Sequence, residues 1–150
     1  MITSDLQRSI GEEESKLLLE AIALFNMGKF WESHEVFEDL WRSEQGELKK
    51  FAQGLVQAAA AFSYIKLRRY ESILYLFDKS REKLQATIHL LPGLRMNLLI
   101  QAIGRAKAAV QRIGEGGLER FDPALFPRIS FSGRSSRGRK SKGIKGKRIR

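Results

Sequence analysis

The chain of 150 residues has the length of a single domain, and its 43% of hydrophobic residues is enough for one buried core. It contains no cysteine, which excludes disulfide bonds, thiolate zinc sites and cysteine nucleophiles. No apolar run approaches the roughly 20 residues of a membrane span, and the first residues lack the basic-then-apolar order of a signal peptide, so we expect no membrane partner and a cytoplasmic location.

The net charge of +10 is unevenly distributed along the chain. Residues 1–127 contain 17 basic and 17 acidic residues, whereas residues 128–150 contain ten basic residues and no acidic one. A partner that is attracted by positive charge is therefore expected to bind the C-terminal end.

Hydrophobic periodicity predicts a succession of helices. They are expected up to about residue 27 and over residues 30–42, 48–68, 71–90 and 95–113. Gly28 favours a helix stop because glycine adopts the left-handed conformation at small steric cost. Pro92 ends the fourth helix because proline cannot extend it, and the apolar side of that helix is expected to include Ile88.

The third helix carries two further patterns. Gly54 and the run of alanines at 58–61 would let another helix approach closely. Gln53, Gln57 and Tyr64 form a polar line that is a candidate partner for the second helix.

The segment after the fifth helix changes character twice. FDPALFPRI is expected to be extended and to lie across the helices as a strap, with Phe121, Leu125, Phe126 and Ile129 as its apolar contacts. From Ser130 onward glycine, serine, lysine and arginine dominate, with too little apolar surface to offset the entropy of ordering. We therefore predict one helical domain over residues 1–129 and a disordered basic tail over residues 130–150.

A shift of 40 residues pairs small with small and aromatic with aromatic positions, for example Ala21 with Ala61 and Phe37 with Phe77. Tetratricopeptide hairpins use similar spacings, although their period is nearer 34 residues. The predicted fold is therefore an all-α bundle of about five helices. It consists of two antiparallel, tetratricopeptide-like hairpins and a closing helix.

The stretch FNMGKFWESHEVFEDLWR gathers aromatic residues, a histidine and four carboxylates on one expected helix. On a helical wheel His34 and Glu38 lie at the edge of the apolar arc, and Trp31 lies off the arc among charged residues. The candidate binding residues on the second and third helices are Trp31, Glu32, His34, Glu38, Asp39, Trp41, Arg42, Gln57 and Tyr64.

Two interpretations of His34 remain open on the sequence. In the first, His34 forms a hydrogen bond to Glu38 or Tyr64 and orients the two hairpins. In the second, the chain is a small metal-assisted hydrolase, because the spacing imitates HExxH with Glu38 in place of the second histidine. His34, Glu35 and Glu38 would then be the catalytic candidates, and His34 and Glu38 the metal candidates, with Asp39 beside them. The hydrolase alternative would require a divalent metal ion. Apart from that alternative, we predict no cofactor.

The basic tail has the composition of a polyanion-binding segment. Its candidate residues are Arg134, Arg137, Arg139, Lys140, Lys142, Lys145, Lys147, Arg148 and Arg150. Phe131 is the only aromatic residue in it, which leaves almost no capacity to stack on bases. Nucleic acid or the ribosome is the partner that this charge predicts.

The stretch FNMGKFWESHEVFEDLWR followed by KKFAQGLVQAAAAF closely resembles the signature of a bacterial and archaeal family, the domain of unknown function 309. The resemblance covers residues 25–76, with an echo in FPRI at 126–129, and implies a small all-helical fold. The family's shared polar positions are matched by Glu32, His34, Glu35, Glu38, Asp39, Trp41, Arg42 and Gln57. Tyr64 stands where relatives often have histidine, and Arg69-Tyr70 where they have Gly-Asn.

The resemblance implies no activity, so the function is predicted from the residues. We expect a noncatalytic binding or scaffold module whose surface between the second and third helices accepts a small ligand or a protein partner. A homodimer is a further alternative, and the tail is expected to add affinity for a polyanion.

Overall fold

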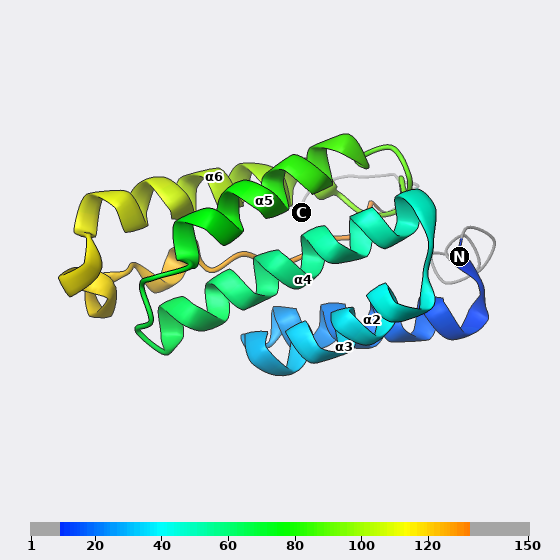
Figure 1. Cartoon of the computed structure of the whole chain (residues 1–150), viewed down its shortest axis with the longest axis horizontal. Helices are drawn as coiled ribbons and strands as arrows, with labels where there is room; N and C mark the ends of the chain where they lie inside the picture. The colour runs from blue at the N-terminus through cyan, green and yellow to red at the C-terminus, as the bar shows by residue number, and fades with distance from the viewer. Residues whose placement is uncertain (1–9, 133–150) are drawn as a thin grey trace, which may run out of the picture.

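The computed structural model describes residues 10–132, which form an antiparallel bundle of helices (Figure 1). The α helices are α2 (Glu12–Asn26), α3 (Phe30–Ser43), α4 (Gly46–Lys66), α5 (Ile73–Ala86) and α6 (Met96–Ile113). Two 3-10 helices follow, η1 (Glu115–Arg120) and η2 (Pro123–Leu125), and residues 10–132 contain no strand beyond one isolated bridge. No helix in this range is long and apolar enough to cross a membrane.

Successive helices run in opposite directions and pack on one another in chain order, α2 on α3, α3 on α4, α4 on α5 and α5 on α6 (Figure 1). The predicted all-α fold of two antiparallel hairpins and a closing helix is confirmed. In the first hairpin the buried Ser33 hydroxyl donates a 2.8 Å hydrogen bond to the carbonyl oxygen of Ala21. The equivalent position of the second hairpin holds the buried Ile73, so the two hairpins pack differently at this point.

Phe62 of α4 connects the two hairpins through aromatic contacts. Its ring centroid lies 6.0 Å from that of Phe25, 5.5 Å from that of Phe30 and 5.0 Å from that of Phe77. Each such pair contributes about 0.5–1.5 kcal/mol beyond the burial of its area. The core is therefore continuous from α2 to α5.

The contact between α4 and α5 depends on Gly54. A Cβ atom at this position would lie 3.0 Å from the Leu84 Cγ atom and 3.2 Å from the Lys83 Cβ atom. The prediction that small residues on α4 admit a neighbouring helix is thus confirmed at Gly54.

The predicted end of the fourth helix is wrong. α5 stops at Ala86, and the buried Thr87 donates its hydroxyl hydrogen bond to the Lys83 carbonyl oxygen at 2.8 Å. The chain then turns, so that Leu91 and Leu94 enter the core. Ile88, which was expected on the apolar side of the helix, is 41% exposed because the helix has already ended.

The expected strap is present (Figure 1, orange), with Phe121 and Ile129 buried and Leu125 and Phe126 half-buried. The prediction that it is extended throughout is wrong for Pro123–Leu125, which form η2 because the Asp122 side chain accepts a hydrogen bond from the Ala124 amide. Asn26, near the end of α2, holds the strap in place. Its side-chain nitrogen donates to the Ile129 carbonyl oxygen at 3.1 Å, and its side-chain oxygen accepts from the Ile129 amide at 2.7 Å.

The strap continues further than the sequence indicated. The Arg95 amide donates to the Ser130 carbonyl oxygen and the Ser132 amide to the Gly93 carbonyl oxygen, both at 2.9 Å, around an antiparallel bridge between Leu94 and Phe131. The prediction of disorder from residue 130 is therefore wrong for residues 130–132, because backbone pairing orders a segment that composition alone does not. The rest of that prediction concerns residues 133–150, outside the described residues.

Candidate functional site

Aromatic rings of α3 and α4 form a stack that reaches the surface. The Trp31 and His34 rings are nearly parallel, 19° apart, with their centroids at 4.5 Å. Tyr64 of α4 lies 6.4 Å from Trp31 at an interplanar angle of 26°. Positions 31 and 34 face the same side because residues three apart are neighbours on a helix. Trp31 contacts both other rings and is 42% exposed, so part of this stack is open to solvent.

His34 is half-buried in the stack, and its environment is poor in hydrogen-bond partners. Its buried Nδ1 atom has no partner among residues 10–132, so the hydrogen bond expected to Glu38 or Tyr64 is not made by this nitrogen. The buried Oε1 atom of Gln57 also has no partner there. Burial lowers the pKa of His34, against the opposing effect of the carboxylates of Glu38 and Glu35. Burial therefore favours the neutral form of His34.

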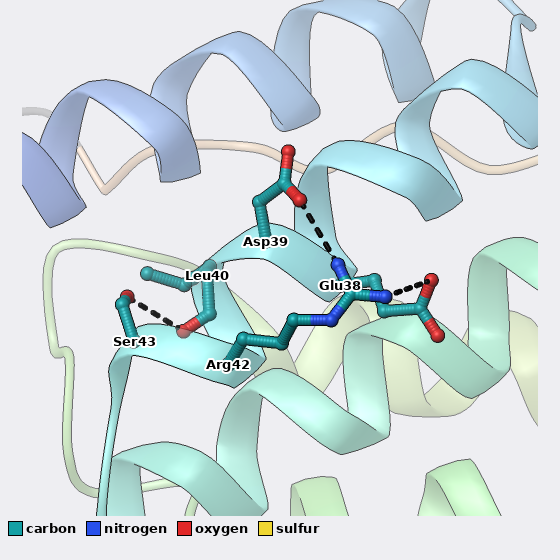
Figure 2. Close-up of polar contacts among 5 residues, drawn as sticks. All are labelled: Glu38, Asp39, Leu40, Arg42 and Ser43. Carbon is teal, nitrogen blue, oxygen red and sulfur yellow. Dashed lines mark hydrogen bonds and ion pairs between the residues drawn. The ribbon is translucent and has the colours of Figure 1, made fainter.

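Two of the four carboxylates of α3 form ion pairs with Arg42 (Figure 2). Its guanidinium forms ion pairs with Glu38 at 3.4 Å and with Asp39 at 3.1 Å. Glu35 and Glu32 are exposed. Within residues 10–132 no group of three or more histidine, aspartate or glutamate side chains is arranged to hold a metal ion. The structure therefore does not bring together the donors that the metal-hydrolase alternative needs.

Trp41 is separate from the stack. It lies ten residues after Trp31 on the same helix, about 15 Å along its axis at 1.5 Å per residue. The Lys49 ammonium stands 4.3 Å from its ring centroid and donates to its carbonyl oxygen at 3.1 Å. Trp41 thus has a lysine partner of its own and does not face Trp31.

An open groove of about 630 Å³ lies beside Trp31, where the turn between α2 and α3 meets the end of α4. Both segments lie toward the same end of the bundle (Figure 1). The groove is lined by Gly28, Lys29, Phe30, Trp31, Glu32, Ser63, Lys66, Leu67 and Arg69. It thus combines aromatic and aliphatic surface with three cations and one carboxylate.

Lys66 is held at the edge of the groove by several contacts. Its ammonium donates to the Gly28 carbonyl oxygen at 2.8 Å and lies 5.3 Å from the Phe30 ring centroid and 5.6 Å from that of Phe126. Gly28 has φ +79°, and a Cβ there would be 3.1 Å from the Lys66 nitrogen. The positive φ therefore favours glycine for the turn, and a Cβ atom would also crowd the Lys66 ammonium.

Sequence reasoning missed the basic side of this site, namely Lys29, Lys66 and Arg69. The signal was present, because MGK and KLRR occur at two turns that an antiparallel bundle brings to one end. The structure brings Trp31 and His34 of α3 together with Tyr64 of α4. Gln57 is neither in this stack nor among the residues that line the groove. The polyanion candidates from Arg134 to Arg150 lie outside the described residues.

Residues 18–75 match the family model described as Domain of unknown function (DUF309). The match covers most of α2, all of α3 and α4 and the start of α5, and so includes both the stack and the groove. No curated protein matches the sequence. The resemblance noted in the sequence is therefore confirmed over residues 18–75, which are similar to the DUF309 family.

Proposed function

We propose that the protein is a noncatalytic binding module whose ligand surface is the Trp31 stack and the adjoining groove. The basic residues after Ser132 add affinity for a polyanion. The observation that carries this proposal is Trp31, a large aromatic residue that is 42% exposed beside an open groove. Exposed aromatic surface of this kind is typical of interaction sites.

The charges around the groove favour an anionic ligand. Lys29, Lys66 and Arg69 face a single carboxylate, that of Glu32. Among residues 10–132, none of the three cations forms an ion pair. A cluster of cations without matching anions raises the local concentration of negatively charged partners.

Binding is better supported than metal-assisted hydrolysis. The alternative requires His34, Glu35, Glu38 and Asp39 to converge on one ion, whereas Glu38 and Asp39 extend toward Arg42 (Figure 2). His34 is turned into the aromatic stack with Trp31. No observation favours the hydrolase over the binding module.

Inorganic polyphosphate is a probe that tests the proposal with charge alone. In two-dimensional NMR of the full chain, we expect it to shift the Trp31 indole signal and the backbone signals of Lys66 and Arg69. The Trp41 indole provides the internal comparison, because it lies about 15 Å further along α3. Shifts that are confined to residues 133–150, with Trp31 unmoved, would show that the groove is not a binding surface.

A further inference from the structure

The groove presents a flat aromatic surface next to cations that have capacity to bind an anion. The Trp31 ring continues into His34 and Tyr64 through nearly parallel planes, 19° and 26° from its own. Arg69 follows the end of α4, and its guanidinium carbon lies 5.2 Å from the Tyr64 ring centroid. A planar ligand group can therefore lie against the exposed part of the Trp31 ring.

The cations stand around this surface in positions that suit phosphate groups. Lys66 uses one of its three N–H donors on Gly28 and keeps two for a ligand. Lys29 and Arg69 are exposed. Arg68 and Arg128 add positive charge at the same end, where the Arg128 guanidinium donates to the Asn26 carbonyl oxygen at 3.2 Å.

We infer that this groove binds single-stranded nucleic acid, with one base stacked on Trp31 and neighbouring phosphates held by Lys29, Lys66 and Arg69. The inference rests on the proposed function and specifies its ligand. Proteins that bind single strands combine these two elements, a basic path for the backbone and aromatic rings for the bases. The folded domain thus supplies the stacking surface that the basic tail lacks.

A strand fits this groove better than a free nucleotide does. Sites for small molecules enclose most of the ligand surface, whereas this groove is open to solvent and can cover one face of a base. An open site gains affinity from several phosphates along a chain, each of which adds a salt-dependent contact. An acidic peptide would match the charges but would not use the flat indole surface for stacking.

The decisive experiment compares two probes that differ only in their bases. The full chain is titrated at about 150 mM salt with oligothymidylate of about ten nucleotides and with an abasic deoxyribose-phosphate strand of equal length. We expect the strand with bases to bind about tenfold more tightly, the usual gain from stacking a base on an aromatic ring. Contributions of the basic tail cancel, because both probes carry the same charge.

Variants then assign the preference to Trp31. Trp31→Ala should bind both probes equally, whereas Tyr75→Ala should keep the preference, since Tyr75 is a 62% exposed aromatic residue on α5 away from the groove. If Trp31→Ala fails to fold, the NMR signals of the natural chain decide. The Trp31 indole should then shift more with oligothymidylate than with the abasic strand.

The phosphate contacts have a separate test. Lys29→Gln and Arg69→Gln should each weaken the binding of both probes to the same extent. Each should also reduce the magnitude of the slope of log K against log salt by about 0.7, the value for one neutralised phosphate of a single strand. Arg105→Gln, an exposed cation of α6, should leave the slope unchanged.

Several outcomes would overturn the inference. The two probes could bind the natural chain equally, or the preference for bases could survive Trp31→Ala. Either result would show that no base stacks on Trp31 in the groove. Polyglutamate or thymidine monophosphate binding as tightly as oligothymidylate, with the same dependence on Trp31, identifies an acidic peptide or a free nucleotide instead. In each case polyphosphate could still shift the groove signals, so the proposed function would stand without this ligand.

Discussion

His34 stacks its ring on Trp31 but lacks a hydrogen-bond partner for one ring nitrogen. One face stacks on Trp31 at 4.5 Å, while the buried Nδ1 atom finds no partner in residues 10–132. A buried polar atom without a partner costs about 1–3 kcal/mol. We interpret His34 as a residue that positions the Trp31 ring.

The lowered pKa of His34 predicts a pH-dependent stability. Burial lowers this pKa in the folded protein below about 6.5, the value in the unfolded chain. As the pH falls, the unfolded chain takes up the proton first. The contribution of His34 to the free energy of unfolding is therefore fully present above about pH 6.5 and is lost as the pH falls through the folded-state pKa. His34→Gln should remove this part of the decline in unfolding free energy between about pH 7.5 and about pH 5.5.

Urea unfolding at the two pH values measures this difference, and His89→Gln is its matched control. His89 is the other histidine of the chain and is exposed in the segment after α5. His89→Gln should keep the decline of the natural chain. A decline of equal size in His34→Gln would show that other groups account for it.

The site shows which residues sequence reasoning can reach. The helical wheel placed Trp31 off the apolar arc, and the structure finds it exposed. Lys29, Lys66 and Arg69 were not predicted as site residues because no helical pattern relates them. They meet through the arrangement of two turns. The ion pairs of Arg42 with Glu38 and Asp39 were foreseeable, since they follow from spacings of four and three residues.

At the scale of helices, the close packing of α4 on α5 depends on the missing side chain of Gly54. Valine favours a helix interior more than glycine does, so at a free position Gly→Val would be mildly stabilising. Here the added atoms meet Leu84 and Lys83 at distances that leave no room. Gly54→Val should therefore lower the free energy of unfolding by about 1–3 kcal/mol, which urea unfolding measures.

Lys50→Val is the control, because Lys50 is exposed on the same helix. It should change the free energy by no more than about 0.5 kcal/mol. An equally stable Gly54→Val protein would mean that α5 moves away at little cost.

The Asn26 side chain is expected to stabilise the position of the strap. Its two hydrogen bonds to Ile129 connect α2 to a segment 103 residues later in the chain. Asn26→Ala leaves the backbone amide and carbonyl of Ile129 without these partners, so the protein should lose about 1–3 kcal/mol of stability. Hydrogen exchange at the Ile129 amide should accelerate by more than global unfolding requires.

Asn97→Ala provides the comparison for this change. Asn97 is exposed on α6 and makes no hydrogen bond through its side chain within residues 10–132. This variant should leave the Ile129 exchange rate unchanged. If Asn26→Ala does the same, the apolar contacts of Phe121 and Phe126 hold the strap without Asn26.

The strap also shows where sequence reasoning about the fold stops. Helix periodicity predicted all five α helices, because each has an apolar side with a spacing of three and four residues. The end of α5 and the pairing of Leu94 with Phe131 were not predicted. Both depend on hydrogen bonds that involve loop residues, and those bonds leave no periodic pattern in the sequence.

For the whole molecule, the distribution of charge defines two basic regions. Nine of the ten excess cations lie in residues 133–150, so a chain ending at Ser132 would carry a net charge of +1 in place of +10. The groove cations belong to the balanced part of the chain, yet they gather at one end of the bundle. The tail should therefore supply most of the affinity for a polyanion, and the groove should supply the preference for a strand that carries bases.

Deletion of residues 133–150 tests this difference. The cut follows Ser132 because that residue pairs with Gly93 and Pro92, and deletion from residue 130 would remove both hydrogen bonds. Affinity for polyphosphate should fall strongly, and the slope of log K against log salt should decrease by about 0.7 for each phosphate that the tail no longer neutralises. The melting temperature should stay nearly unchanged, because the buried core lies within residues 10–132.

A full-length variant with the nine cations changed to glutamine separates charge from chain length, and it should behave like the deletion in both measurements. In the deleted protein, oligothymidylate should keep its advantage over the abasic strand, because Trp31 remains in place. Salt-sensitive binding to polyphosphate that is undiminished after deletion would show that the groove end of the bundle, and not the tail, supplies the polyanion affinity. Loss of the base preference together with the tail would instead show that the groove holds a strand only when the tail has already recruited it.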